Sequence, residues 1–262
     1  AELFRSNYYK KMVRDNPQKA LSLQYKSAHH KNMNWDNPQT LDEKIMWLEA
    51  MTDTSIWSQL TDKYEVRKFI EKKGYKEILV DCYGVWNNIG EINFETLPNK
   101  FVIKCTHDSG STHIIKDKSK ANIVDICKDL QAKLHPIGYT TCEPHYLSIQ
   151  PRIIAEELLE EKGLKDLSTS MIDYKVWCFN GVPNVIFLCY DRHKDLNGHL
   201  TASYDMYDAK TWTKRREYLD VAYRPDDNMC FPAPDNLEKM LEYAANISKD
   251  FPVAREIGRA HV

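Results

Sequence analysis

The pattern of apolar and polar positions predicts helices in the first part of the chain. Residues 1–40 are polar and aromatic, which indicates short helices. Thr40 and Glu43 have the spacing of a capping box, in which the threonine side chain accepts from an amide of the first turn and the glutamate reaches back. An apolar face beginning at Ile45 continues that helix, and a second helix is predicted over about 61–72.

Strand-like runs occupy the middle of the chain. Short apolar runs predict strands over 77–80, 101–105 and 112–115, and a polar loop over 106–111 connects the last two. Apolar side chains then recur at helical spacing over 123–134, which predicts an amphipathic helix.

The second half of the chain predicts antiparallel strands. A strand over 152–157 leads to an acidic turn. The segments 173–179 and 185–190 flank Asn180-Gly181, and Asn-Gly is a strong hairpin signal because both residues tolerate positive φ. A final helix is predicted over 237–247. The predicted fold class is therefore α+β.

Composition and charge exclude several classes of protein. The 262 residues hold 36 Lys and Arg against 38 Asp and Glu, and no basic cluster of the kind that binds nucleic acid is present. No apolar run approaches the roughly 18–20 residues that span a bilayer. Seven scattered cysteines without Cys-x-x-Cys indicate reduced thiols in a cytoplasmic protein. The sequence contains no Gly-x-Gly and no P-loop motif.

The loop after Lys104 is the strongest chemical signal. Backbone amides of Ser109, Gly110 and Ser111 are placed to meet anionic oxygens, and Lys104 supplies a point charge, so the element is typical of a phosphate site. The alternative is an ordinary Ser/Gly turn with an incidental lysine. Lys63 offers a second cation from a different element.

An acidic segment separates two predicted strands. The run Glu156-Glu157-Leu158-Leu159 lies where a backbone hinge between lobes would lie. The alternative is a solvated turn.

The order of these motifs resembles the TupA-like branch of the ATP-grasp superfamily. Asp62-Lys63 with Arg67, the runs 101–110 and 154–159, and Asp173-Tyr174-Lys175 with Phe179-Asn180-Gly181 follow one another as in that family. The segment 37–48 matches as well, and Lys-Cys-Thr-His-Asp-Ser-Gly at 104–110 is the most specific part. The resemblance covers roughly residues 35–255 and implies two α+β lobes that grip a nucleotide.

The resemblance implies ATP-binding roles in the first lobe. Lys63 and Lys104 correspond to the lysines that hold the α- and β-phosphates. The loop 106–111 corresponds to a flap over the triphosphate, and Ser111 stands where members often have glycine, which implies a stiffer flap. The cofactor-binding residues implied in this loop are His107, Asp108, Ser109, Gly110 and Ser111.

The resemblance also implies roles later in the chain. The backbone of Glu156, Glu157, Leu158 and Leu159 would contact adenine, and Glu160 or Glu161 would reach the ribose. Asp173 and Lys175 would face the phosphates and the acceptor. Arg192 is a candidate for an acyl-phosphate or acidic substrate, with a surface arginine as the alternative. The implied catalytic residues are Lys104, Lys175 and Arg192.

The resemblance divides the chain into an N-terminal helical extension, 1–39, and an ATP-grasp region, 40–255. The latter comprises 40–95, a flap lobe over 96–150 and an incomplete C-terminal lobe over 151–255. Residues 256–262 resemble the translation of a sequencing adapter, which predicts a non-native tail and excludes His261 as a catalytic candidate. The Mg²⁺ ligands of the family would then lie beyond the chain end, and such a chain is expected to bind nucleotide weakly without turnover.

The implied function is an ATP-dependent carboxylate–amine ligase that acts through an acyl-phosphate in cell-surface polysaccharide biosynthesis. Its cofactors would be ATP and Mg²⁺, and its partners a carboxylate substrate, either a small molecule or a polysaccharide precursor, and an amine acceptor. Neither nucleic acid nor a transmembrane segment is expected. The alternatives are a glycosyltransferase of capsular or teichuronic-type polysaccharide synthesis, which the absence of Asp-x-Asp disfavours, and an inactive nucleotide-binding remnant.

Overall fold

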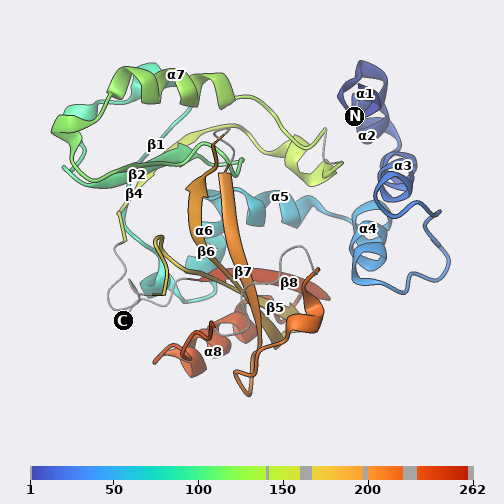
Figure 1. Cartoon of the computed structure of the whole chain (residues 1–262). Helices are drawn as coiled ribbons and strands as arrows, with labels where there is room; N and C mark the ends of the chain where they lie inside the picture. Colours follow the sequence, from blue (N-terminus) through green and yellow to red (C-terminus); the bar gives the residue numbers. More distant parts are fainter. Residues whose placement is uncertain (1, 140–141, 160–166, 197–199, 221–228, 259–262) are drawn as a thin grey trace. The chain divides into compact units, whose positions relative to one another are not determined.

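The computed structural model describes residues 2–139, 142–159, 167–196, 200–220 and 229–258 (Figure 1). The chain forms two compact units, Ala1–Leu158 and Leu159–Val262. Each unit contains a four-stranded antiparallel sheet together with helices, so the fold is mixed α+β as predicted. No helix among the described residues is both long and apolar enough to cross a membrane.

Helices build the N-terminal part of the first unit. The Ser6 hydroxyl accepts from the Tyr9 amide and begins α2, and Asn16 caps α3, whose first residue is Pro17. Tyr9 and Leu21 are buried between these helices. The prediction of short helices over 1–40 is therefore confirmed. The bounds are α1 Glu2–Arg5, α2 Asn7–Asp15, α3 Pro17–His29 and α4 Leu41–Met51.

The predicted capping box at the start of α4 is also confirmed. Thr40 Oγ1 accepts from the Glu43 amide at 3.3 Å, and Glu43 Oε2 accepts from the Thr40 amide at 3.0 Å. The Tyr25 hydroxyl and the Gln39 amide donate to the same carboxylate at 2.6 and 2.7 Å. The Tyr25 hydroxyl, followed by the two amides, lowers the pKa of Glu43 to about 2.

The sheet of the first unit has the strand order β1-β4-β2-β3, and α7 packs against it (Figure 1). Phe101, Ile103 and Ile153 from the sheet and Leu130 from α7 are fully buried in one core. The predicted strands over 101–105, 112–115 and 152–157 and the predicted helix over 123–134 correspond to observed elements. These are β2 Phe101–Cys105, β3 His113–Ile115, β4 Ile153–Glu156 and α7 Ile123–Lys133.

Two predictions in this unit need correction. The helix expected over about 61–72 is α6 Glu65–Lys72, which begins later than predicted because Asp62 takes part in a turn before it. A separate helix, α5 Ser55–Thr61, precedes that turn. The strand expected over 77–80 is wrong. A 3₁₀ turn, Lys76–Ile78, stands there with Ile78 exposed, and β1 Cys82–Trp86 begins after it. None of the side chains at 77–80 is buried, so this short apolar run does not form a strand of the sheet.

The second unit carries the sheet β7-β6-β5-β8, with α8 packed on it. Asn180 and Gly181 have φ of 49° and 76° and form the tight turn of the predicted hairpin, which is confirmed. The predicted final helix is confirmed as well, whereas β7 and β8 are strands that the sequence pattern did not predict. The bounds are β5 Asp173–Phe179, β6 Val182–Lys194, β7 Leu200–Asp208, α8 Leu237–Ser248 and β8 Val253–Gly258.

The expected tail at 256–262 begins within β8. The backbone of β8 pairs antiparallel with β5, and Gly258 lies opposite Tyr174. Residues 259–262, including His261, lie outside the described residues.

Candidate functional site

Lys104 and Glu156 meet on one face of the first sheet. Glu156 on β4 lies opposite Val102 on β2, and Lys104 follows two residues later on the same face. Lys104 Nζ is 2.6 Å from Glu156 Oε2, and Arg67 Nη1 from α6 is 3.1 Å from Glu156 Oε1. The side chains of Lys104, Arg67 and Glu156 are 20%, 14% and 9% exposed. One carboxylate therefore balances two cations, and the lysine is the more exposed of the two.

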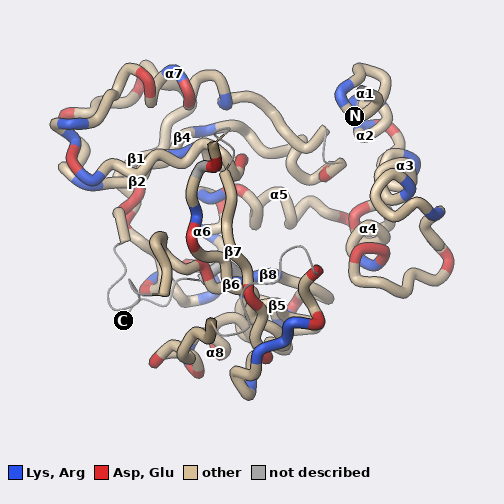
Figure 2. Tube along the Cα trace, viewed as in Figure 1, with Lys and Arg blue, Asp and Glu red and all other residues tan. Residues whose placement is uncertain are grey.

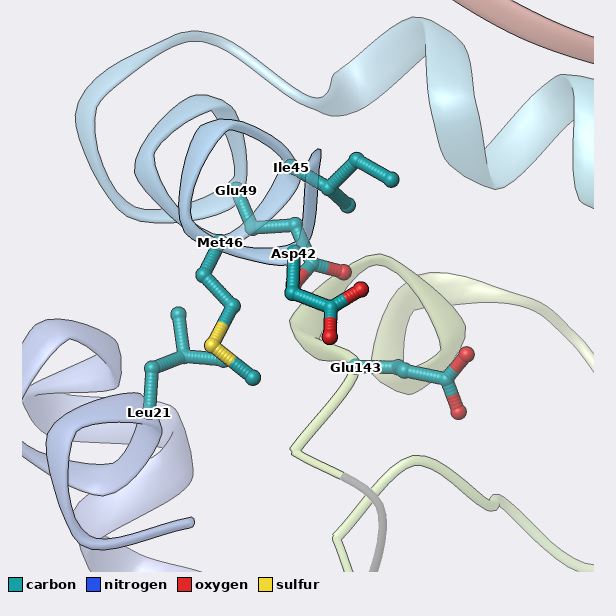
Figure 3. Close-up of a pocket in the computed structure, with 6 residues that line it drawn as sticks. All are labelled: Leu21, Asp42, Ile45, Met46, Glu49 and Glu143. Carbon is teal, nitrogen blue, oxygen red and sulfur yellow. The ribbon is translucent and has the colours of Figure 1, made fainter. Parts of the chain in front are cut away.

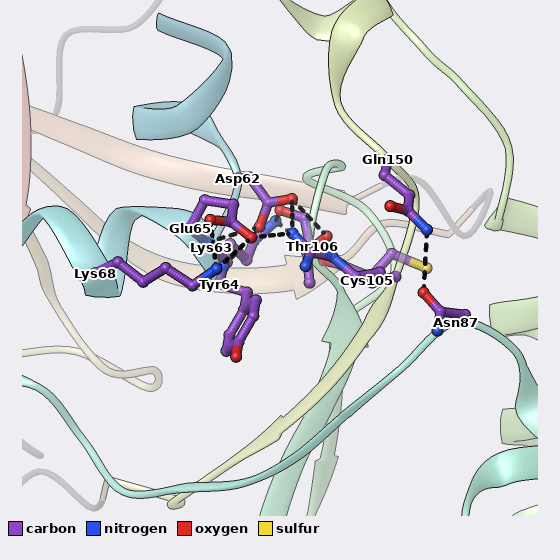
Figure 4. Close-up of polar contacts among 10 residues, drawn as sticks. Asp62, Lys63, Tyr64, Glu65, Lys68, Asn87, Cys105, Thr106 and Gln150 are labelled. Atoms are coloured by element: carbon purple, nitrogen blue, oxygen red, sulfur yellow. Dashed lines mark hydrogen bonds and ion pairs between the residues drawn. The ribbon is translucent and has the colours of Figure 1, made fainter. Parts of the chain in front are cut away.

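Lys63 lies against the backbone at the start of the loop 106–111, which follows β2. Its ammonium donates to the carbonyl oxygens of Cys105 at 3.2 Å and Thr106 at 3.3 Å (Figure 4). It also donates to the carbonyl oxygen of Asp108. Its amide also donates to Thr106 O at 3.0 Å. Burial lowers the pKa of Lys63, and the nearby Asp108 opposes that shift.

Asp62 fixes this segment from the other side. Its buried carboxylate accepts from the amides of Tyr64 at 2.7 Å and Glu65 at 3.1 Å at the start of α6. It also accepts from the Thr106 hydroxyl at 3.3 Å and from Arg152 Nη2 at 3.0 Å. The start of α6 is thereby bonded to the first residue of the loop.

The base of the loop 106–111 is closed by a serine. Ser111 is buried, its hydroxyl accepts from the Cys105 amide at 2.7 Å, and it donates to Asp108 Oδ1. Ser109 and Gly110 at the tip are exposed. In the described part of the chain, no hydrogen bond uses the amides of Ser109, Gly110 or Ser111. The loop that follows Lys104 thus contains three amides that no described group uses.

His107 points into the first unit. The residue is only 1% exposed, and its Nε2 lies 2.8 Å from the His135 carbonyl oxygen. Burial lowers the pKa of His107, so the ring is neutral at pH 7. The side chain therefore provides no cation at the loop.

In the second unit, Asp173 and Arg192 come together. The β6 strand bulges between Tyr190 and His193, and Asp191 there has a φ of 48°. The bulge brings the Arg192 guanidinium to Asp173, with which it forms an ion pair, and to Met171 O at 3.1 Å. Arg192 is thus held by protein groups.

Lys175 lies on the same face of β5, two residues after Asp173. Its ammonium is 5.5 Å from the centre of the Phe187 ring, and burial lowers the pKa of Lys175. No carboxylate of the described residues forms an ion pair with Lys175. It is the least compensated cation among the predicted site residues.

The hinge predicted at 156–159 contains the boundary between the units, after Leu158. Glu156 belongs to β4, and the Glu157 amide donates to Asp81 O at 2.9 Å. Across the described ranges, no hydrogen bond uses the backbone of Leu158 or Leu159. Glu160 and Glu161 lie outside the described residues.

Residues 43–256 match the family described as TupA-like ATPgrasp. The chain belongs to the TupA-like ATP-grasp family. This confirms the family that the order of motifs predicted. A comparison with curated proteins finds no match.

Solved structures of ligases are among those to which the chain is similar. The D-alanine–D-alanine ligase from Bacillus anthracis complexed with ATP is 12% identical, with 76% of this chain and 50% of that chain covered, at a TM-score of 0.41. A second structure of that enzyme is 13% identical, with 75% of this chain and 51% of that chain covered, at a TM-score of 0.39. The D-alanine–D-alanine ligase from Helicobacter pylori is 10% identical, with 94% of this chain and 61% of that chain covered, at a TM-score of 0.37. The chain spans about half to three fifths of the length of these ligases.

The residues that sequence reasoning missed in this TupA-like chain are mainly charge partners. Arg67 and Asp62 stood in the recognised motif without a role, and Arg152 was not singled out. An ionisable residue at the edge of an apolar strand, as Arg152 precedes Ile153, is the signal that would have found it, because such a charge needs a partner.

Mg²⁺ ligands are not assembled in the described residues. No group of three or more His, Cys, Asp and Glu side chains there has a metal-binding arrangement. The described part of this TupA-like chain therefore does not by itself fit the ion that its family implies.

A cavity of about 350 Å³ lies among the N-terminal helices (Figure 3). The carboxylates of Asp42 and Glu49 point toward the segment that carries Glu143 (Figure 3). None of the predicted site residues lines this cavity, so it is separate from the Lys104 loop. Its lining consists of Leu21, Asp42, Ile45, Met46, Glu49 and Glu143.

Charges of both signs are interspersed along each unit (Figure 2). The net charge is −2, so the cations near the predicted site are local features rather than part of a broad basic surface.

Proposed function

We propose that this chain binds ATP and serves an ATP-dependent carboxylate–amine ligase that acts through an acyl-phosphate in the assembly of cell-surface polysaccharide. The observation that carries the proposal is the loop over 106–111 that follows Lys104, in which the amides of Ser109, Gly110 and Ser111 form no hydrogen bond with a described group. Successive free amides with a neighbouring lysine form a concave site for phosphate oxygens. Membership of the TupA-like ATP-grasp family supports ATP as the source of that phosphate.

The reaction consists of two displacements. A carboxylate oxygen of the substrate attacks the γ-phosphorus, the bond from that phosphorus to the bridging oxygen breaks, and ADP leaves. The amine nitrogen then attacks the acyl carbon, inorganic phosphate leaves, and the amine releases a proton to solvent. Lys104 and the loop amides would stabilise negative charge on the phosphoryl oxygens.

The remaining predicted residues receive roles within this proposal. The backbone of Leu158 and Leu159, which forms no other hydrogen bond in the described part of the chain, would bind adenine. Lys175 would meet a phosphate or the carboxylate substrate, since it lacks a described ion-pair partner. The division into an extension, 1–39, and an ATP-grasp region, 40–255, belongs to the same proposal.

Thermal unfolding with Mg-ATP and with UDP-sugars tests the nucleotide. A ligand at about 100 times its Kd adds about 2.7 kcal/mol, which raises Tm by roughly 5–10 °C at this size. We expect that shift with ATP and its loss in Lys104→Ala. Lys116→Ala, which removes an exposed lysine elsewhere in the first unit, should keep it. A shift with UDP-sugar and none with ATP would favour the glycosyltransferase instead.

A further inference from the structure

The loop over 106–111 is also held from outside, by a lysine of α7. Lys133 lies in the last turn of that helix, and its Nζ donates to the carbonyl oxygen of Gly110 at 2.8 Å. The two residues are 23 positions apart along the chain. Lys133 lies outside the motif that predicted the loop, so the contact follows from the placement of α7 beside it.

Gly110 has few other contacts that fix its position. It is exposed, and a side-chain carbon placed on it would meet no heavy atom within 4 Å apart from its chain neighbours. In the part of the chain that the structure describes, the bond from Lys133 is the one hydrogen bond that Gly110 makes. Glycine restricts its own backbone less than other residues do, so the orientation of this peptide depends on that bond.

The ammonium of Lys133 is itself fixed by a carboxylate. Asp129, four residues earlier on α7, has its Oδ2 2.9 Å from Lys133 Nζ and 2.7 Å from His113 Nε2 on β3. Burial raises the pKa of Asp129, but the hydrogen bonds of Lys133 and His113 lower it by more, so the carboxylate is charged at neutral pH. Leu130, the next residue of α7, is fully buried against the sheet and fixes this turn of the helix.

A bond to the Gly110 carbonyl also sets the direction of the next amide. In a planar trans peptide, the C=O of one residue and the N–H of the next point in opposite directions. The N–H of this peptide belongs to Ser111, and it is one of the three loop amides that no described group uses. With the carbonyl bound to Lys133, the Ser111 amide therefore points away from α7.

We propose that Lys133 is a positioning residue of the ATP site, because its bond to the Gly110 carbonyl holds the Ser111 amide in the orientation that receives a phosphate oxygen. Asp129 assists by anchoring the ammonium of Lys133. The inference rests on the proposed function, since it concerns a residue of α7 that prepares the loop proposed to bind ATP. Lys133 acts through the backbone of the loop, so its effect is present before nucleotide binds.

NMR relaxation of the nucleotide-free chain measures this effect at the amides of Gly110 and Ser111. Lys133→Met removes the donors and keeps an apolar side chain of similar length, so the order parameters of both amides should fall below about 0.6, the range of flexible backbone. Lys133→Arg keeps a cationic donor and should restore the wild-type values. Lys128→Met is the matched control, because Lys128 is an exposed lysine of α7 whose described ion pair is with Asp125, at 3.6 Å. It should leave both order parameters unchanged.

Titration calorimetry with ATP on the same variants completes the test. We expect Lys133→Met to bind ATP about five-fold more weakly, and Lys133→Arg to bind within about two-fold of wild type. Weaker binding with unchanged order parameters overturns the proposal, because Lys133 would then act on the ligand directly. Greater mobility with unchanged affinity overturns it as well, because the orientation of the Ser111 amide would then not matter for binding.

A second variant tests the anchor, and the two proposals fail in different ways. Asp129→Asn leaves the donor of Lys133 in place but releases it, so a smaller fall in the same two order parameters is expected, and no fall would remove Asp129 from the proposal. If the wild-type chain does not bind ATP, the proposed function fails, whereas the order parameters still decide whether Lys133 fixes the loop. If ATP binds and Lys133→Met keeps the wild-type affinity, only the inference about Lys133 fails.

Discussion

The cations of the first unit and those of the second are compensated in different ways. In the first unit Lys104 shares Glu156 with Arg67, and Lys63 is surrounded by carbonyl oxygens. In the second unit Arg192 is paired with Asp173, but Lys175 forms no ion pair with a described residue and lies 5.5 Å from the centre of the Phe187 ring. The first set is held in place by the fold, whereas Lys175 gains most from an incoming anion.

The largest expected effect is the loss of the shared carboxylate. Glu156→Gln leaves two mostly buried cations without their partner, so we expect the free energy of unfolding to fall by about 3 kcal/mol. Urea denaturation of the variant and of wild type measures this difference in the free energy of unfolding. Glu157→Gln, a change at the exposed neighbour, should have little effect.

The second unit offers a matched change at its own ion pair, between Arg192 and Asp173. Asp173→Asn removes the carboxylate from Arg192, whose side chain is one quarter exposed and also bonds Met171 O, so we expect a loss of about 1 kcal/mol. Equal losses in Glu156→Gln and Asp173→Asn would contradict the difference drawn between the two units.

A smaller effect, opposite in sign for stability and binding, is expected at Lys175. Burial lowers the pKa of Lys175 in the folded state, so the unfolded chain binds more protons and stability rises with pH between the folded pKa and the ordinary value. Lys175→Met should therefore unfold no more easily at pH 7, yet bind ATP about three-fold more weakly. Titration calorimetry measures the affinity for ATP, and urea denaturation measures the free energy of unfolding. A clear loss of stability with unchanged affinity would show a structural lysine.

The smallest effect concerns pH and the buried His107. Because burial lowers the pKa of His107, the unfolded chain takes up its proton near the ordinary value of 6.5 while the folded chain does not. The histidine thus reduces stability progressively as pH falls below about 6.5. Between pH 7.5 and 5.5, the stability of His107→Gln should fall less than that of wild type. The midpoint of denaturant unfolding at each pH measures this. His135→Gln, at an exposed ring, is the control.

Local signals predicted much of the fold. The Thr40–Glu43 capping box and the Asn180-Gly181 turn are set by neighbouring residues, and both appear as expected. The strands β1, β7 and β8 were missed because polar residues or glycine interrupt their patterns, and pairing with distant strands stabilises them.

The candidate site shows the same division. Lys104 and the loop at 106–111 form one continuous motif, so the sequence could single them out, and their role in binding stays a prediction. The link from Arg67 to Glu156 joins positions 89 residues apart, and the carbonyl contacts of Lys63 reach 42 to 45 residues along the chain. Only the register of the sheet and the turn before α6 bring such groups together.

The hydroxyl of Ser111 has a consequence for the entropy of binding. It joins the Cys105 amide to the Asp108 carboxylate, so both ends of the loop are fixed before any ligand arrives. A glycine at this position would remove both hydrogen bonds and leave the loop with more conformations. Less conformational entropy then remains to be lost when an anion settles on the tip, which favours tighter binding from the same set of contacts.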